Sequence, residues 1–302
     1  KGTLFDVKAD LPENLRMYIC FFPDRKAFAD AEYAIGDAEI GYIGTRTAVT
    51  AALLLARHQM KNMGGMEALR TVLRSLKYDL IYVLAANSPG EMEYQELAMR
   101  KITSDCGGIA MELLHEIPFI GSMFWLTLVR GTAYPMAYRP GGQFSAGWAR
   151  DSAMDNAAAY GELSEEAKRK WIEKGGMLDD TGDCTWMTQY ENSGWVHCEQ
   201  VFFYDPHNKK HLETLLPVQV DFTIAALERC MDQAVNQSPV MRKLFSPMQG
   251  NYNIWQKRLQ EKFDPKSSAD SSYYTGEEDF PFSALDPKTS EKLKELVAKY
   301  TW

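Results

Sequence analysis

The sequence predicts an α+β fold in which two successive split-βαβ, or ferredoxin-like, units place helices on one face of an antiparallel sheet. Three observations predict it. Strand-like and helix-like segments follow the order β-α-β-(α)-β-α-β up to residue 113. A similar order begins again after a connector rich in Gly, Pro and aromatic residues at 119–140. From Ser246 the pattern changes to helical and irregular segments. We therefore expect a duplicated domain over 1–245 and a helical and irregular segment over 246–302.

The first unit is defined by apolar runs bounded by turn residues. Its predicted strands are 15–22, 40–43, 78–85 and 109–113. Asp24 stands where a helix N-cap belongs, and apolar residues recur at helical spacing after it. Ser88-Pro89 opens a second helix, which continues through Met92, Leu97 and Ile102. Two further helices are predicted over 48–58 and 66–76.

The second unit repeats this pattern. We predict a strand over 142–148 and a helix over 152–174 with a potential break at Gly161. Two strands, 183–190 and 195–204, flank a turn and read as a hairpin, and a long helix follows Asp205-Pro206. Such a sheet has helices on one face, which leaves the other face free to cover a ligand or a partner.

The C-terminal segment has a different pattern. Apolar residues at i, i+3, i+7 and i+11 predict a helix from Tyr252 to Phe263, which ends at Asp264-Pro265. An irregular stretch over 266–287 precedes a last helix up to Tyr300. Because long irregular stretches are uncommon in compact domains, we expect this segment to leave the duplicated domain and pack on something else.

Composition excludes several classes of protein. The 302 residues carry a net charge of −8 without a Lys/Arg-rich stripe, which argues against nucleic-acid or anionic-membrane binding. No apolar run reaches the ~20 residues of a membrane span. Five scattered cysteines without a C-x-x-C pair argue against a disulfide framework or a zinc site. They favour a protein of the reducing cytoplasm. His207 and His211 have metal-ligand spacing but flank Asn-Lys-Lys, so a solvated face is the favoured interpretation.

The order of segments and three stretches resemble a known family. These are AEIGYIGTRTAVTAALLLARH (38–58), SGWVHCEQVFFYDP (193–206) and LQEKFDPKSSADSSYYTG (259–276). They are similar to the C-terminal half of FAD-linked oxidoreductases of the vanillyl-alcohol oxidase and p-cresol methylhydroxylase group. The resemblance implies a duplicated ferredoxin-like cap over the flavin, followed by a segment that returns to the FAD-binding domain.

The resemblance also shows what the sequence lacks. There is no G-x-G-x-x-G loop, so the flavin-binding half is expected on a separate chain or upstream in a precursor, and FAD is expected to be held mainly by that half. The stretch 142–146 has neither His nor Tyr for covalent attachment, which favours non-covalent FAD. A phenolate-binding Tyr-Arg pair is missing from 231–238, and the metal motifs of the 2-hydroxy-acid branch are absent.

His197 and Glu199 are the main candidates for chemistry. They alternate on one predicted strand and so project to the same side of the sheet. There His197 could take a proton from a substrate hydroxyl while hydride passes to the flavin, with Glu199 orienting the imidazole. The alternative is a sheet histidine beside a solvated carboxylate, and a register error of one residue would reverse the assignment.

Further residues are candidates for contacts with the substrate or the cofactor. Tyr138 and Arg139 precede the strand expected to approach the flavin and suit a carboxylate or phenolate. Substrate contacts are predicted for Arg46, Gln143, Trp186 and Tyr190, and cofactor contacts for Tyr273 and Tyr274. Each of them has a plain structural alternative as a surface charge, a turn residue or an aromatic in the core.

We therefore expect the substrate-covering part of an FAD-dependent oxidoreductase that acts on a small alcohol- or phenol-type molecule. Its partners would be an FAD-binding domain or subunit and the small-molecule substrate. The sequence leaves the oligomeric state open, a homo-oligomer included. A non-enzymatic ligand-binding or assembly module remains the alternative, because fold alone does not determine function.

Overall fold

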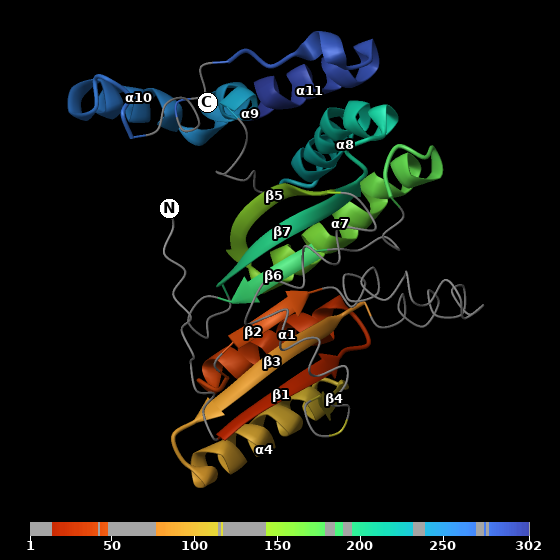
Figure 1. The fold of residues 1–302 in the computed structure, drawn as a ribbon, viewed down its shortest axis with the longest axis vertical. Coiled ribbons are helices and arrows are strands. Elements are labelled where there is room, and N and C mark those ends of the chain that lie inside the picture. The colour runs from red at the N-terminus through yellow and green to blue at the C-terminus, as the bar shows by residue number, and fades with distance from the viewer. Residues whose placement is uncertain are drawn as a thin grey trace. The chain divides into compact units, whose positions relative to one another are not determined.

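A computed structural model describes residues 14–41, 43–47, 77–113, 116, 143–178, 185–189, 195–231, 239–269, 275 and 278–301. The chain forms two compact units (Figure 1). The first comprises 1–137 with 153–155 and 186–196, and the second comprises 138–152, 156–185 and 197–302. The architecture is α+β, as predicted. The helices predicted over 48–58 and 66–76 lie outside the described residues.

The first unit is built on an antiparallel sheet. Its strands are β1 (Asn14–Phe21), β2 (Ile43–Thr47), β3 (Asp79–Ala86), β4 (Ile109–Glu112) and β6 (Thr185–Gln189), the last from Trp186 onward. They lie in the order β4-β1-β3-β2-β6, and the β1–β3, β1–β4, β2–β3 and β2–β6 pairs are all antiparallel. Tyr82 on β3 faces Tyr18 on one side and Gly44 on the other.

Two capped helices accompany this sheet. The carboxylate of Asp24 accepts from the Ala27 amide at the start of α1 (Arg25–Asp37), and the Ser88 hydroxyl accepts from the Glu91 amide at the start of α4 (Pro89–Asp105). The Asp24 cap and the helix start at Ser88-Pro89 are those that the sequence predicts. The helix α4 packs on β1, where the Met99 sulfur lies 3.5 Å from Cys20 Sγ.

The opposite face of β1 and β3 is apolar and buried. Alternate residues of the two strands, together with the residue after β4, form one core cluster. It comprises Leu15, Met17, Ile19, Ile81, Val83 and Leu113. Because side chains alternate along a strand, this register fixes which residues meet the helices and which meet this second core.

The strand predicted at 40–43 is wrong in position. β2 begins only at Ile43. Ile40 follows the end of α1 at Asp37 and is still bonded to the last turn of that helix. Its amide donates to the Ile35 carbonyl at 3.4 Å, and Gly41 follows with φ +89°, a left-handed conformation that glycine adopts without steric cost. The chain therefore turns over Gly41 before the strand starts.

Gly44 on β2 provides a test of this packing. A Cβ at that position would lie 2.8 Å from Gln189 Oε1 and 2.9 Å from Tyr82 Cε1, both of them closer than real contacts allow. We expect Gly44→Ala to lower the free energy of unfolding by about 1–3 kcal/mol. Gly90→Ala is the control, because nothing lies within 4 Å of its position. Chemical denaturation of both variants measures the effect, and equal stabilities would contradict it.

The second unit contains most of β5 (Gln143–Ala153) and β7 (Trp195–Tyr204), which are neighbours in the sheet. The helix α7 (Met154–Glu173) runs through Gly161 without the break considered above. It packs on β7, where the Cys198 thiol lies 3.8 Å from the Ala157 carbonyl. The helix α8 (Lys209–Glu228) joins it through Tyr160 and Phe222, whose ring centroids are 6.3 Å apart.

Short helical elements follow. They are α9 (Pro239–Phe245), a 3-10 turn (Ser246–Gln249), α10 (Tyr252–Phe263), a second 3-10 turn (Phe282–Ala284) and α11 (Pro287–Tyr300). The helix α11 is tied to α8 by a 2.8 Å ion pair between Lys292 and Glu228 and by the Tyr300 hydroxyl, which donates to the Leu227 carbonyl at 3.1 Å. By contrast, α10 buries none of its residues. Among the described helices, none has the length and apolar character needed to cross a membrane.

Candidate active site

The strand β7 alternates strictly between buried and accessible side chains. Val196, Cys198, Gln200 and Phe202 are at most 2% exposed. Trp195 is 51% exposed, and the side chains of His197 and Glu199 each keep 21% of their surface. The buried set faces α7, as the contact between Cys198 and Ala157 shows. The other set therefore lies on the opposite, partly accessible face of the strand.

His197 and Glu199 form a pair on this face. His197 Nε2 lies 3.3 Å from Glu199 Oε1. The prediction that both side chains project to one side of the sheet is confirmed. That side is opposite to the one on which the buried residues of β7 lie. An imidazole held by a carboxylate can exchange protons through its other ring nitrogen, because the carboxylate orients the ring and stabilises the imidazolium form.

Trp195 is a residue that the sequence argument missed. It stands two positions before His197 in the same strand, so both side chains leave the same face of β7. The resemblance and the polar pair pointed only to positions 197 and 199. The alternation of side chains along the strand would have been enough to include Trp195 on the same face. Its large exposed ring gives that face an apolar surface beside the polar pair.

The other predicted residues have different outcomes. Arg46, Gln143 and Trp186 lie in β2, β5 and β6, and Arg46 pairs with Met187 across the strands, but their side chains lie outside the described part. Tyr138, Arg139, Tyr190, Tyr273 and Tyr274 also lie outside the described residues. Their roles stay predictions.

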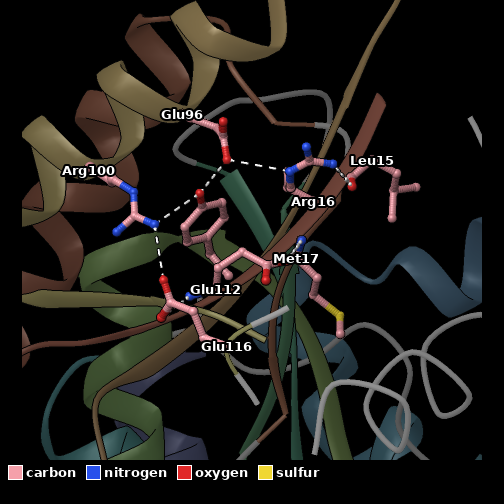
Figure 2. Close-up of polar contacts among 8 residues, drawn as sticks. Leu15, Arg16, Met17, Glu96, Arg100, Glu112 and Glu116 are labelled. Atoms are coloured by element: carbon pink, nitrogen blue, oxygen red, sulfur yellow. Dashed lines mark hydrogen bonds and ion pairs between the residues drawn. The ribbon is translucent and has the colours of Figure 1, made fainter. Parts of the chain in front are cut away.

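A second polar cluster ties β1 to α4 in the first unit (Figure 2). The Tyr18 hydroxyl donates to Glu96 Oε1 at 2.5 Å and accepts from Arg100 at 3.2 Å, while the Arg100 guanidinium lies 4.8 Å from the centre of the Tyr18 ring. Arg100 also pairs with Glu116 at 3.6 Å, and Arg16 with Glu96 at 3.7 Å. Burial, followed by the bond to Glu96, raises the pKa of Tyr18 well above its ordinary value. Tyr18 therefore stays neutral and acts as a structural tie.

The two histidines near the start of α8 have different surroundings. His211 is 6% exposed, and its Nδ1 accepts from the Asp205 amide at 3.0 Å, so the ring holds the turn before the helix. The prediction of a solvated face is therefore wrong for His211. His207 is exposed. Within the described ranges, no group of three or more His, Cys, Asp or Glu side chains is placed to hold a metal ion.

The chain was compared with known proteins. No protein-family model and no curated sequence matches it. Its structure is similar to p-cresol methylhydroxylase with substrate bound, with a TM-score of 0.59 and 13% identity over 89% of this chain and 54% of that one. It is also similar to the isoeugenol complex of 4-ethylphenol oxidase from Gulosibacter chungangensis, with a TM-score of 0.57 and 14% identity over 85% of this chain and 52% of that one.

The chain thus spans about half the length of both solved structures. The likeness extends over most of this chain, although few residues are identical. The resemblance is therefore confirmed in the fold: the chain has the fold found in FAD-linked oxidoreductases of the vanillyl-alcohol oxidase and p-cresol methylhydroxylase family.

Proposed function

We propose that this chain is the substrate-covering part of an FAD-dependent oxidoreductase that oxidises a small alcohol- or phenol-type substrate. The fold similarity supports this class of enzyme. The observation that carries the proposal is the pair of His197 and Glu199 on the accessible face of β7. A proton acceptor on an accessible sheet face is what oxidation of a hydroxyl group requires.

FAD, when bound, would accept the hydride. This chain would hold the substrate and move a proton. His197 would take the hydroxyl proton, Glu199 would orient the imidazole, and the exposed ring of Trp195 would border the substrate. Tyr138 and Arg139 are proposed to contact its polar group, with Arg46, Gln143, Trp186 and Tyr190 around it. Tyr273 and Tyr274 are proposed to contact the flavin.

FAD is proposed to be bound non-covalently and mainly by a partner domain. The sequence has no Gly-rich pyrophosphate loop, and the stretch 142–146 contains no His or Tyr. What this chain offers instead is a sheet face with a polar pair and an aromatic ring. Such a face fits a role in covering a planar ring system and in excluding water from it.

A duplicated ferredoxin-like domain over 1–245 is proposed as the scaffold. In the first unit, the chain order β1-α1-β2-β3-α4-β4 combines with the spatial order β4-β1-β3-β2, which is the arrangement of a split-βαβ unit. The later elements β5-α7-β6-β7-α8 repeat the start of that order. This repetition supports two copies of one supersecondary unit.

The segment 246–302 is proposed to dock on the FAD-binding domain, chiefly through α10. Four apolar side chains form a stripe along this helix: Tyr252, Trp255, Leu259 and Phe263, with exposures of 49%, 59%, 56% and 76%. We call them the α10 stripe. A patch of this kind marks an interaction site, since isolated soluble domains rarely expose one.

The decisive test is spectroscopic. The complete protein, purified with its FAD-binding domain, should show the visible bands of oxidised flavin. Anaerobic addition of alcohols, phenols and hydroxy acids, one at a time, should bleach those bands with at least one substrate class. Absence of flavin bands would contradict the proposed FAD-dependent enzyme and favour a non-enzymatic binding module. Bands that no panel member bleaches would remove the alcohol or phenol substrate class.

A further inference from the structure

Three polar side chains meet inside the first unit. They come from α1, β3 and β6, namely Glu32, Tyr82 and Gln189. Tyr82 Oη lies 3.0 Å from Glu32 Oε1 and 2.9 Å from Gln189 Oε1. Glu32 has no exposed surface and Tyr82 has 1%. The Tyr82 hydroxyl thus contacts Glu32, which is 50 positions away in the sequence, and Gln189, which is 107 positions away.

Burial identifies the state of Glu32. Its side chain has no exposed surface, and only Oε1 has a hydrogen-bond partner, the hydroxyl of Tyr82. An unpaired carboxylate charge is far costlier to bury than a neutral carboxyl group. Glu32 is therefore a neutral carboxylic acid while it stays buried.

The electrostatic surroundings agree with this state. No Lys or Arg in the described part of the chain forms an ion pair with Glu32, and its Oε2 is buried with no hydrogen-bond partner. Burial raises the pKa of Glu32 to about 8. The titratable groups facing it are Tyr82 on β3 and Cys20 on β1, and burial raises the pKa of both, that of Cys20 to about 12. Both stay neutral where Glu32 titrates, so the site holds no compensating charge.

The fold leaves room for this contact in particular. Gly44 stands opposite Tyr82 on β2, and the Gly41 Cα adjoins the Tyr82 ring, where an added Cβ would lie 3.1 Å from Cδ1. Gln189 is the last residue of β6, a strand that pairs with β2 through residues 186–188. The three side chains thus hold the end of β6 against α1 and β3.

We propose that Glu32, Tyr82 and Gln189 form a proton-dependent latch that fixes the end of β6 while Glu32 is protonated and releases it when Glu32 ionises. In the closed latch Glu32 keeps its proton, and in the open latch it titrates like an ordinary carboxyl group. Between these two pKa values, each pH unit favours opening by about tenfold. The latch is therefore tightest in acid, loosens as the pH rises toward 8, and changes no further above that.

Hydrogen exchange of the full chain tests the latch directly. After correction for intrinsic exchange rates, protection of the 185–189 amides should fall by up to tenfold per pH unit between about pH 5.5 and 8. The amides of β1, which lies across the sheet, should show no such slope. Glu32→Gln keeps a side-chain oxygen that can accept from the Tyr82 hydroxyl but cannot ionise, so its β6 protection should be independent of pH. Glu93→Gln, a matched change at an exposed position, should keep the wild-type slope.

Two further measurements remain informative if Glu32→Gln does not fold. The infrared spectrum of the wild type should contain the band of a protonated carboxyl group at pH 7, and Tyr82→Phe should lower β6 protection even at pH 6. A wild-type β6 without a pH slope, an equal slope in Glu32→Gln, or the absence of the protonated-carboxyl band would each overturn the latch.

Discussion

Replacing His197 with alanine is expected to slow reduction of the bound flavin by about 10²- to 10⁴-fold, the usual contribution of a positioned general base. The reason is geometric. His197 lies on the accessible face of β7, and Glu199 Oε1 holds its Nε2 at 3.3 Å. Alanine removes the proton acceptor and leaves the buried residues of the same strand in place. Stopped-flow measurement of anaerobic flavin reduction by the active substrate gives the rate.

The controls separate chemistry from folding. His207→Ala removes an exposed histidine at the start of α8 and should leave the reduction rate unchanged. Flavin content of the His197→Ala protein should also equal that of the wild type. Glu199→Gln should give a smaller loss, because it removes the charge that orients the ring without removing the ring. A His197→Ala rate within a factor of two of the wild type would assign the pair a structural role only.

Local signals in the sequence predicted much of this fold. Asp24 caps its helix and Ser88-Pro89 opens the next one, as predicted, because helix starts depend on residues only three positions apart. The strand predicted at 195–204 is observed with those bounds, and its alternation placed His197 and Glu199 on one face. These features depend on periodicity and on near neighbours, which a single sequence contains.

Contacts between distant residues were not predictable in this way. Leu97 fits the apolar pattern of its helix but is 63% exposed, whereas the polar Gln95 is buried at 8% and donates to the Ala85 carbonyl. The bond from Tyr18 to Glu96 joins residues 78 positions apart. No local pattern marks such partners, because register and helix packing decide them together. The same limit explains why Glu32 looked like any charged helix residue.

The α10 stripe shows how a local pattern can predict a helix without its environment. The periodicity of Tyr252, Trp255, Leu259 and Phe263 correctly predicted the helix, and a core-facing stripe would be the usual expectation. The structure shows the reverse: the stripe points outward, while the polar Asn253 on another face donates to the Thr275 carbonyl at 3.1 Å. The helix is held by its polar side, and its apolar side is exposed.

The chemistry of the stripe favours a protein partner. Arg258 lies 5.0 Å from the Trp255 ring centre, and Lys262 lies 5.7 Å from that of Phe263. Trp, Tyr, Phe and Arg are the residues enriched at the centres of protein interfaces. From typical side-chain areas, the stripe exposes on the order of 400–500 Å², about half of one partner's share in a standard interface. Its basic rim would suit an acidic border on the proposed FAD-binding domain.

Leu259→Asp in the complete flavoprotein is therefore expected to weaken this docking by about 30- to 1,000-fold, the range for a charge placed at an interface hot spot. The dissociation constant between the two parts measures it directly, and a lower temperature of flavin release reports the same loss within one polypeptide.

Leu97→Asp is the matched control, because Leu97 on α4 is similarly exposed at 63% against 56% for Leu259. Because aspartate is readily solvated on a free surface, the fold of this chain should tolerate both changes. Equal flavin release in the two variants would exclude the α10 stripe from the interface, whereas a shift from dimer to monomer caused by Leu259→Asp alone would assign the stripe to a second copy of this chain.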